Sequence, residues 1–276
     1  MTYSRRAFAQ VDVDDVLPST NVTHPKHYKL YKFYDVRDPR HDHIRDSVSK
    51  CHDNPGYPVL FVPGHWGSYD QARSLGAHGI RLTGKDERIS YKQLRDRFLN
   101  ENSSSFMSRD GSGDRFLYDV YAVDFGSEAS GVHASLLHSQ ALYVDYAIDV
   151  ILNLCKEKYP PRTSVTIVAH SVGGIVARAV PLLVPSQENK IRTVVTLASP
   201  HRGLPYTFDE TVGRFQKDLN AFWKKRHGKN RQGRIDDSVL FVSISGGQRD
   251  ELLRQEVMSL ENLDDFSISV SSQASD

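Results

Sequence analysis

A serine lies at the centre of a stretch of small and apolar residues, VTIVAHSVGGIVAR, where an expected strand meets an expected helix. Ala169 stands two residues before Ser171 and Gly173 two residues after it. This is the spacing of the nucleophile elbow, G-x-S-x-G, with alanine at the first glycine position. Small side chains are required because the tight turn brings these two flanking positions together. The pattern predicts Ser171 as a nucleophile for acyl transfer, with a helix N-terminus behind it that favours a developing oxyanion.

A second segment, VPGHWGS at 62–68, directly follows an early apolar run. An acyl-transfer site of this kind takes its second oxyanion donor from the loop after such a strand. Gly64 would let that loop approach Ser171 closely. The backbone N–H of His65 or of Trp66, together with that of Val172, would then form the oxyanion hole. The alternative reading is a plain Pro-Gly turn.

The acid and the base of a catalytic triad are expected after the serine in the chain. Asp250 follows a late strand, 79 residues after Ser171, and is the candidate acid. It could also cap the helix that follows it. Residues 251–276 contain no histidine, so no base stands in the expected place. His201 follows a strand and remains a surrogate base, whereas His170 is expected to pack beneath the elbow.

Alternation of apolar and polar residues separates strands from helices along the chain. Strands are expected at 28–34, 57–62, 118–125, 164–169, 191–198, 238–245 and 266–270, the first of them at an edge. Helices are expected at 71–79, 135–158, 172–183, 208–225 and 250–260. This order favours one α/β domain over 1–276, with a mostly parallel sheet and helices on both faces. Residues 81–115 are expected to form an insertion or loop, and 200–235 a lid-like helical segment.

Composition narrows the function further. The 276 residues carry 35 Lys and Arg against 34 Asp and Glu, and a net charge of +1 gives no reason to expect nucleic acid as a partner. The two cysteines, Cys51 and Cys155, form no CxxC motif, so no zinc site is expected, and their pairing stays open. No cofactor or metal is implied. The chain shows neither a signal peptide nor a run of 18 apolar residues, so read alone it is expected to be soluble and cytosolic.

Several longer segments resemble the GPI inositol-deacylases, and the resemblance runs in order through most of the chain. It is carried by PVLFVPGHWGSYDQARS, VTIVAHSVGGIVARA and VVTLASPHRGLPYTFDETVGRFQKDLNAFW. The stretch from Phe125 to Glu128 (FGSE) and the segment SPHRGLP are its more specific parts. The resemblance implies an α/β-hydrolase with Ser171 as nucleophile and Asp250 as acid. It also implies a base histidine after the last strand, so the chain is expected to lack the C-terminal strand and histidine segment and to be truncated at both ends.

The family further implies a membrane hydrolase of the endoplasmic reticulum. Such an enzyme removes the acyl chain from the inositol of GPI-anchored proteins, a step linked to their transport. The implied substrate is therefore a GPI-anchored protein or GPI lipid, and the reaction is that of a serine esterase. Two alternatives stay open: another lipid esterase, such as a phospholipase or acyltransferase, and a catalytically inactive fragment without the base histidine.

Overall fold

The computed structural model describes residues 6–12, 25–35, 56–77, 118–154, 156, 163–204, 209–228, 239–246, 250, 253, 255–260 and 267–271. Cys51, Cys155 and the insertion expected at 81–115 lie outside them.

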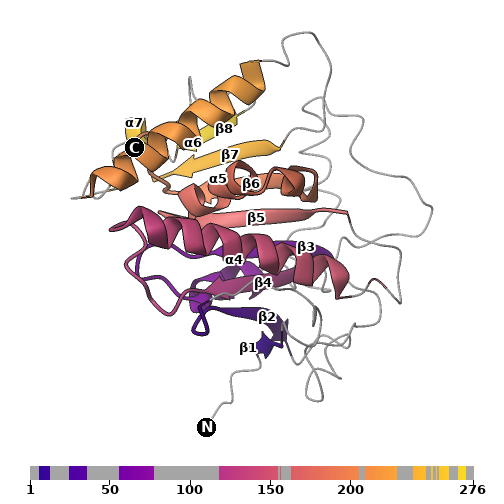
Figure 1. Cartoon of the computed structure of the whole chain (residues 1–276). Helices are drawn as coiled ribbons and strands as arrows, with labels where there is room; N and C mark the ends of the chain where they lie inside the picture. Colours follow the sequence, from indigo (N-terminus) through magenta and orange to yellow (C-terminus); the bar gives the residue numbers. More distant parts are fainter. Residues whose placement is uncertain are drawn as a thin grey trace, which may run out of the picture.

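One sheet organises the described part of the chain (Figure 1). Its eight strands are β1 (Arg6–Val11), β2 (Lys29–Asp35), β3 (Tyr57–Val62), β4 (Tyr118–Asp124), β5 (Val165–His170), β6 (Ile191–Leu197), β7 (Leu240–Ser245) and β8 (Ser267–Ser271). They lie in the order β1-β2-β4-β3-β5-β6-β7-β8. β1 pairs antiparallel with β2, and β2 with β4, while every later pairing is parallel. The expectation of a mostly parallel sheet is confirmed.

Of the expectations about the two ends of the sheet, one is wrong and one is confirmed. β2 is not an edge strand, because β1 pairs with it along its outer side from Arg6 to Val11. The strand expected at 266–270 is confirmed as β8, which pairs in parallel with β7, with Phe241 opposite Ser267 and Ser245 opposite Ser271. The sequence does not indicate β1, because RAFAQV is short and mixes a charge, an amide and small residues.

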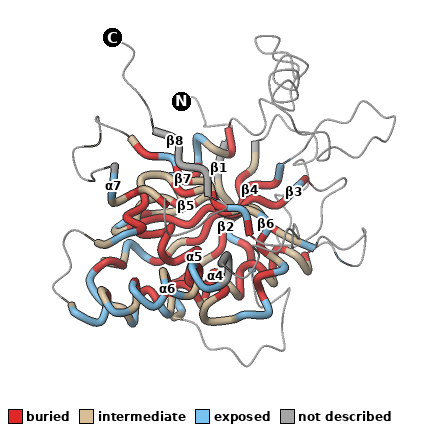
Figure 2. The backbone as a smooth tube through the Cα atoms, turned by 90° about the horizontal axis from the view of Figure 1, so that it is seen from above, coloured by how far each residue is buried: buried red, intermediate tan, exposed pale blue. Residues whose placement is uncertain are grey.

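Three long helices cover one face of the sheet (Figures 1 and 2). They are α4 (Ala134–Asn153), α5 (Gly173–Leu183) and α6 (Glu210–Gly228). The short η3 helix (Pro185–Lys190) leads into β6, and α7 (Gln255–Met258) lies beside β7. α5 is the central helix because it starts directly after the elbow and is buried on almost every side.

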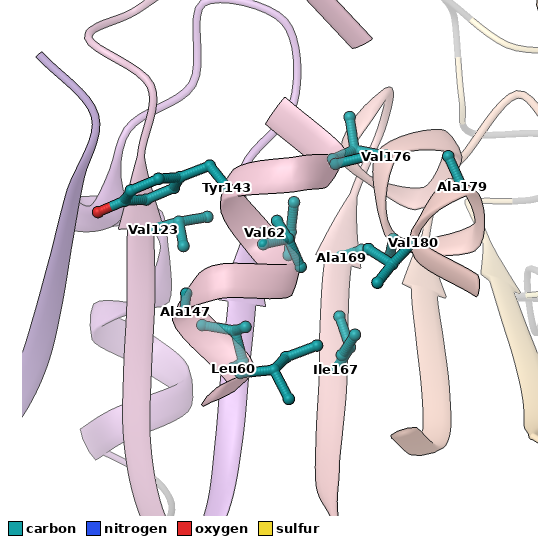
Figure 3. Packing of buried hydrophobic residues seen from close by; sticks show 14 of the residues in the cluster. Leu60, Val62, Val123, Tyr143, Ala147, Ile167, Ala169, Val176, Ala179 and Val180 are labelled. Carbon is teal, nitrogen blue, oxygen red and sulfur yellow. The ribbon is translucent and has the colours of Figure 1, made fainter. Parts of the chain in front are cut away.

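The main core fills the space between the strands and these helices (Figure 3). Leu60 and Ile167 from the central strands face Ala147 of α4 and Val180 of α5, and all four are fully buried. Burial of each such aliphatic side chain stabilises the fold by about 1.5–3 kcal/mol. β3 is buried at every position after Tyr57, as expected for a parallel strand covered on both faces. This packing fixes the direction in which β5 delivers Ser171.

The opposite face of the sheet is covered by a shorter helical segment. The η2 helix (Tyr69–Ala72) continues as helix to Ala77 and packs over β3 and β4. Phe8 of β1 contacts the rings of Phe33 and Tyr69 edge-on, with centroids 5.2 and 5.3 Å apart. Helices therefore lie on both faces, as the sequence predicts.

α6 lies within the segment that the sequence predicts to be lid-like. Its Trp223 is 1% exposed and contacts Phe241 of β7 edge-on, with ring centroids 4.7 Å apart. The indole N–H of Trp223 donates a hydrogen bond to the backbone oxygen of Arg178 on α5. α6 is thus packed into the core through these contacts, and a lid-like role for any part of 200–235 stays a prediction.

Candidate active site

Ser171 lies on a strained turn between β5 and α5. Its backbone φ is +52°, in the left-handed region that a residue with a side chain rarely adopts. Its N–H donates to the oxygen of Leu197 at 2.8 Å, and its own oxygen accepts the N–H of Gly174 at 3.0 Å. These two bonds hold the turn against the end of β6 and the start of α5. The backbone is therefore that of a nucleophile elbow, as VTIVAHSVGG predicts.

Small residues around the elbow allow the loop after β3 to lie directly against it. A Cβ added at Gly173 would lie 2.5 Å from the backbone oxygens of Val62 and Pro63. One added at Gly64 would lie 2.8 Å from the Cβ of Ser171 and 2.8 Å from the oxygen of His170. The two segments that the sequence pairs, 62–68 and the serine turn, are thus brought together at the carboxyl ends of neighbouring parallel strands. The carboxyl end of such strands is where α/β sheets bind ligands.

The backbone N–H groups near Ser171 differ in what they bind. The N–H of Trp66 donates to the oxygen of Glu128 at 3.0 Å and is occupied. The N–H groups of His65 and Val172 have no partner among the described residues. Of the two loop amides that the sequence offers, the geometry therefore favours His65. The oxyanion hole formed by His65 and Val172 stays a prediction.

The His65 ring is fixed as a neutral imidazole. Its Nδ1 accepts the N–H of Gly131 at 3.1 Å, so the ring proton lies on Nε2. Burial lowers the pKa of His65 below its usual value. Both observations keep the ring uncharged at neutral pH, so it orients its own loop without adding a positive charge beside Ser171.

Asp250 lies at the carboxyl end of β7, one strand beyond β6. A Cβ on Gly246 would lie 3.0 Å from the Cβ of Asp250, so Asp250 lies directly against the end of the strand. Oδ1 of Asp250 accepts the N–H of Leu253 at 2.9 Å. The carboxylate therefore caps the chain that leads to α7, which is the structural role that the sequence left open, and an additional role as triad acid stays a prediction.

The histidine beside the nucleophile is largely enclosed. Burial lowers the pKa of His170, and the nearby charge of Asp250 offsets this only in part. Its Nδ1 is buried and has no hydrogen-bond partner among the described residues. This enclosure agrees with the packing role beside the elbow that the sequence predicts for His170.

His201 is not available as a base for Ser171, and this alternative is wrong. Its side chain is fully buried, with Nδ1 3.3 Å from Nη1 of Arg178 and Nε2 2.8 Å from the hydroxyl oxygen of Thr196. Burial and the charge of Arg178 hold the pKa of His201 well below its usual value. The Thr196 hydroxyl in turn donates a hydrogen bond to the backbone oxygen of Val242. Both ring nitrogens are engaged in a structural network, which the sequence alone did not reveal.

Glu128 contacts the loop of the candidate site, and no motif in the sequence indicates a role for it. Its backbone oxygen receives the Trp66 N–H, and its side chain anchors the loop that follows β4. The only sequence signal was the FGSE stretch, which stood out through resemblance alone. Within the described ranges, no group of three or more His, Cys, Asp or Glu side chains is arranged to hold a metal ion. No helix in the described part of the chain is both long and apolar enough to cross a membrane.

The fold and the serine turn together show which class of enzyme fold this is. An eight-stranded sheet of this order, with a serine in left-handed conformation between strand and helix, is an α/β-hydrolase. The family model of the PGAP1-like alpha/beta domain matches residues 53–274, and the chain belongs to this family.

Individual proteins similar to this chain are named GPI inositol-deacylases. A GPI inositol-deacylase of Phaeosphaeria nodorum is 33% identical over 217 residues, which are 75% of this chain and 19% of that protein. One of Schizosaccharomyces pombe is 32% identical over 225 residues, 78% of this chain and 18% of that protein. The chain thus spans less than a fifth of the length of these relatives. Among solved structures, S-formylglutathione hydrolase of Staphylococcus aureus matches with a TM-score of 0.48 and 14% identity, over 97% of this chain and 88% of that chain.

Proposed function

We propose that this domain is a serine esterase that removes the acyl chain from the inositol of a GPI lipid or GPI-anchored protein. The observation that carries the proposal is the conformation of Ser171, which is held at φ +52° against Gly64 at the carboxyl end of the parallel strands. A residue in this strained region persists only where its surroundings enforce it, and such residues cluster at functional sites. The choice of substrate is supported by the relatives, which are named GPI inositol-deacylases.

The proposed reaction proceeds through an acyl-enzyme. The Ser171 oxygen attacks the ester carbonyl carbon, and the backbone N–H groups of His65 and Val172 stabilise the oxyanion. The intermediate collapses, the bond to the inositol oxygen breaks, and that oxygen leaves with a proton. Water then hydrolyses the acyl-serine and releases a fatty acid. Removing one oxyanion donor from such a site typically slows turnover by about 10²–10³-fold.

The base that takes the Ser171 proton is not assigned. Among the described histidines beside the elbow, His201 has both ring nitrogens engaged, and the Nδ1 of His170 is enclosed. A serine hydroxyl is a weak nucleophile without such a base. We therefore design the activity experiments for the 276-residue chain and, in parallel, for any longer natural polypeptide that contains it.

The proposed cellular setting is the endoplasmic reticulum membrane, where the lipid substrate would be met during protein transport. The consensus sites for N-glycosylation at Asn21 and Asn102 offer a direct readout of entry into the lumen. A glycosidase-sensitive change in mobility that is lost when both asparagines are replaced by glutamine supports this setting. An unmodified chain with cytosolic fractionation contradicts it.

The substrate is tested with Ser171→Ala against inositol-acylated GPI. The wild-type protein should release fatty acid from this lipid, and the variant should lose turnover by about 10⁴–10⁶-fold. Ser139→Ala on α4 is the matched control and should retain full activity. A glycerophospholipid and an inositol-acylated GPI are compared side by side. Preference for the glycerophospholipid would replace the GPI assignment with a phospholipase, and undiminished turnover in Ser171→Ala would remove Ser171 as the nucleophile.

A further inference from the structure

One carboxylate in the loop after β4 binds two other parts of the molecule. The Oε2 atom of Glu128 accepts the hydroxyl of Tyr28 at 2.6 Å and the side-chain N–H of Gln140 at 2.9 Å. Its Oε1 atom lies 2.8 Å from Nε2 of His27. Gln140 also donates to the hydroxyl of Ser130 in the same loop. Glu128 therefore joins the entry to β2, the loop after β4 and helix α4.

Burial and charge strengthen the hydrogen bonds of the Glu128 carboxylate. The side chain of Glu128 is 18% exposed, while Gln140 and Tyr28 are buried. Burial alone would raise the pKa of Glu128, but the bonds from Tyr28, His27 and Gln140 together lower it by more. The net shift is downward, so the carboxylate stays ionised at neutral pH. Burial and the same carboxylate raise the pKa of Tyr28, which keeps its hydroxyl as a donor. Hydrogen bonds to an ionised acceptor are stronger than those between neutral groups.

The same loop contacts two consecutive residues beside Ser171. The oxygen of Glu128 accepts the N–H of Trp66, and the N–H of Gly131 donates to the ring of His65. Trp66 has φ +52°, a left-handed conformation that only glycine adopts freely. Its side chain is 70% exposed, so burial of the indole does not explain why this conformation persists. The hydrogen bonds from the Glu128 loop do.

We propose that Glu128 is a positioning residue that clamps Trp66 in its left-handed conformation, so that the Trp66 amide is occupied and the His65 amide is left as the oxyanion donor. This inference rests on the proposed function for its catalytic consequence, but the clamp itself is a property of the fold. It assigns a role to the FGSE stretch that the proposed reaction does not use. It also explains why the loop amide next to Trp66, and not that of Trp66, is free beside Ser171.

Amide hydrogen exchange of the 276-residue chain tests the clamp without any need for activity. In the wild type, the Trp66 amide should exchange more slowly than the His65 amide. Glu128→Ala should speed exchange at Trp66 by about tenfold, and Glu128→Gln by less, because glutamine keeps one acceptor oxygen. Asp149→Asn is the matched control: it removes a carboxylate that binds Gln187 and Lys190 beside η3, and Trp66 should not respond. Equal exchange at His65 and Trp66, or no response to Glu128→Ala, overturns the clamp.

The catalytic consequence is measured as the rate at which a fluorophosphonate labels Ser171. Glu128→Ala should slow labelling by about 10- to 100-fold, because a displacement of roughly 1 Å in a catalytic group can cost this much. A second substitution, Trp66→Gly, should restore part of the rate, since glycine holds φ +52° without strain, whereas Trp66→Ala should not. A purely structural role for Glu128 would not distinguish glycine from alanine at position 66.

The outcomes distinguish the positioning role of Glu128 from the proposed esterase function. Loss of Trp66 protection in Glu128→Ala with an unchanged labelling rate overturns the positioning role and leaves the proposed function intact. Labelling that does not depend on Ser171 overturns the proposed function, and the exchange data still decide whether Glu128 clamps Trp66. Rescue by glycine and not by alanine supports the inference in full.

Discussion

At the residue scale, the backbone conformation of Ser171 is the main evidence for a nucleophile. Ser171 adopts a conformation that costs an ordinary residue about 1–2 kcal/mol, and the fold maintains it through bonds to Leu197 and Gly174. The pattern of small residues predicted this turn correctly, because an elbow leaves no room for larger side chains. The occupied amide of Trp66 was not predictable, because hydrogen bonds between distant loops leave no local pattern in a sequence.

Gly64 offers a prediction at this scale. Gly64→Ala would place a methyl group 2.8 Å from the Cβ of Ser171 and 3.4 Å from its Oγ. The loop or the elbow must then shift by several tenths of an ångström. We expect acyl transfer to fall by about 10- to 100-fold and the free energy of unfolding to fall by about 1–3 kcal/mol. Ester turnover and thermal unfolding measure the two effects.

The matched control is Gly213→Ala on α6, where an added Cβ meets nothing within 4 Å. This variant should keep full activity and gain about 0.5–1 kcal/mol from the better helix former. Unimpaired turnover in Gly64→Ala would show that the loop after β3 does not determine the geometry at Ser171.

At the scale of helices and strands, apolar periodicity located most elements to within a few residues. The range 57–62 coincides with β3, and 191–198 differs from β6 by one residue at its end. The expected helix at 250–260 is the main exception, because helix forms only at Gln255–Met258 within the described residues. Residues 251, 252 and 254 lie outside the described residues, and Oδ1 of Asp250 accepts the N–H of Leu253 three residues on, which is the bond that an N-cap makes.

α4 contains an acidic pair that lowers stability at neutral pH. Burial and the charge of Asp149 raise the pKa of Asp145 to about 6, compared with 3.8 for a free side chain. A raised carboxyl pKa means that the charged form is disfavoured in the fold, so the penalty is fully present above pH 6 and disappears below pH 3.8. Asp145→Asn should therefore raise the free energy of unfolding by about 1 kcal/mol at pH 7.5, allowing for solvent screening, and by less at pH 4.5.

Denaturant unfolding at the two pH values measures this difference. Asp218→Asn, at an exposed position on α6, is the control and should change stability little at either pH. If Asp145→Asn raised the free energy of unfolding equally at pH 7.5 and pH 4.5, or lowered it at pH 7.5, the raised pKa of Asp145 would be contradicted.

At the scale of the molecule, the site arises because the sheet order brings distant segments to one edge. β3, β5 and β7 end beside one another or one strand apart, and the loop of Gly64, the elbow of Ser171 and the turn of Asp250 follow them. The sequence predicted this convergence because parallel strands align their carboxyl ends. The contact of His201 with Arg178, and those of Glu128 with Tyr28 and Trp66, join residues far apart in the sequence. No local pattern indicates such contacts.

The central claim is that Ser171 forms a covalent acyl-enzyme, and rapid-quench mass spectrometry tests it most directly. The 276-residue chain, and any longer natural polypeptide that contains it, is mixed with an activated short-chain ester and quenched in acid within milliseconds. The account predicts that the peptide containing Ser171 gains the mass of one acyl group, that free acid follows, and that Ser171→Ala abolishes both. An acyl group on a different residue, or ester turnover that persists in Ser171→Ala, would contradict the account.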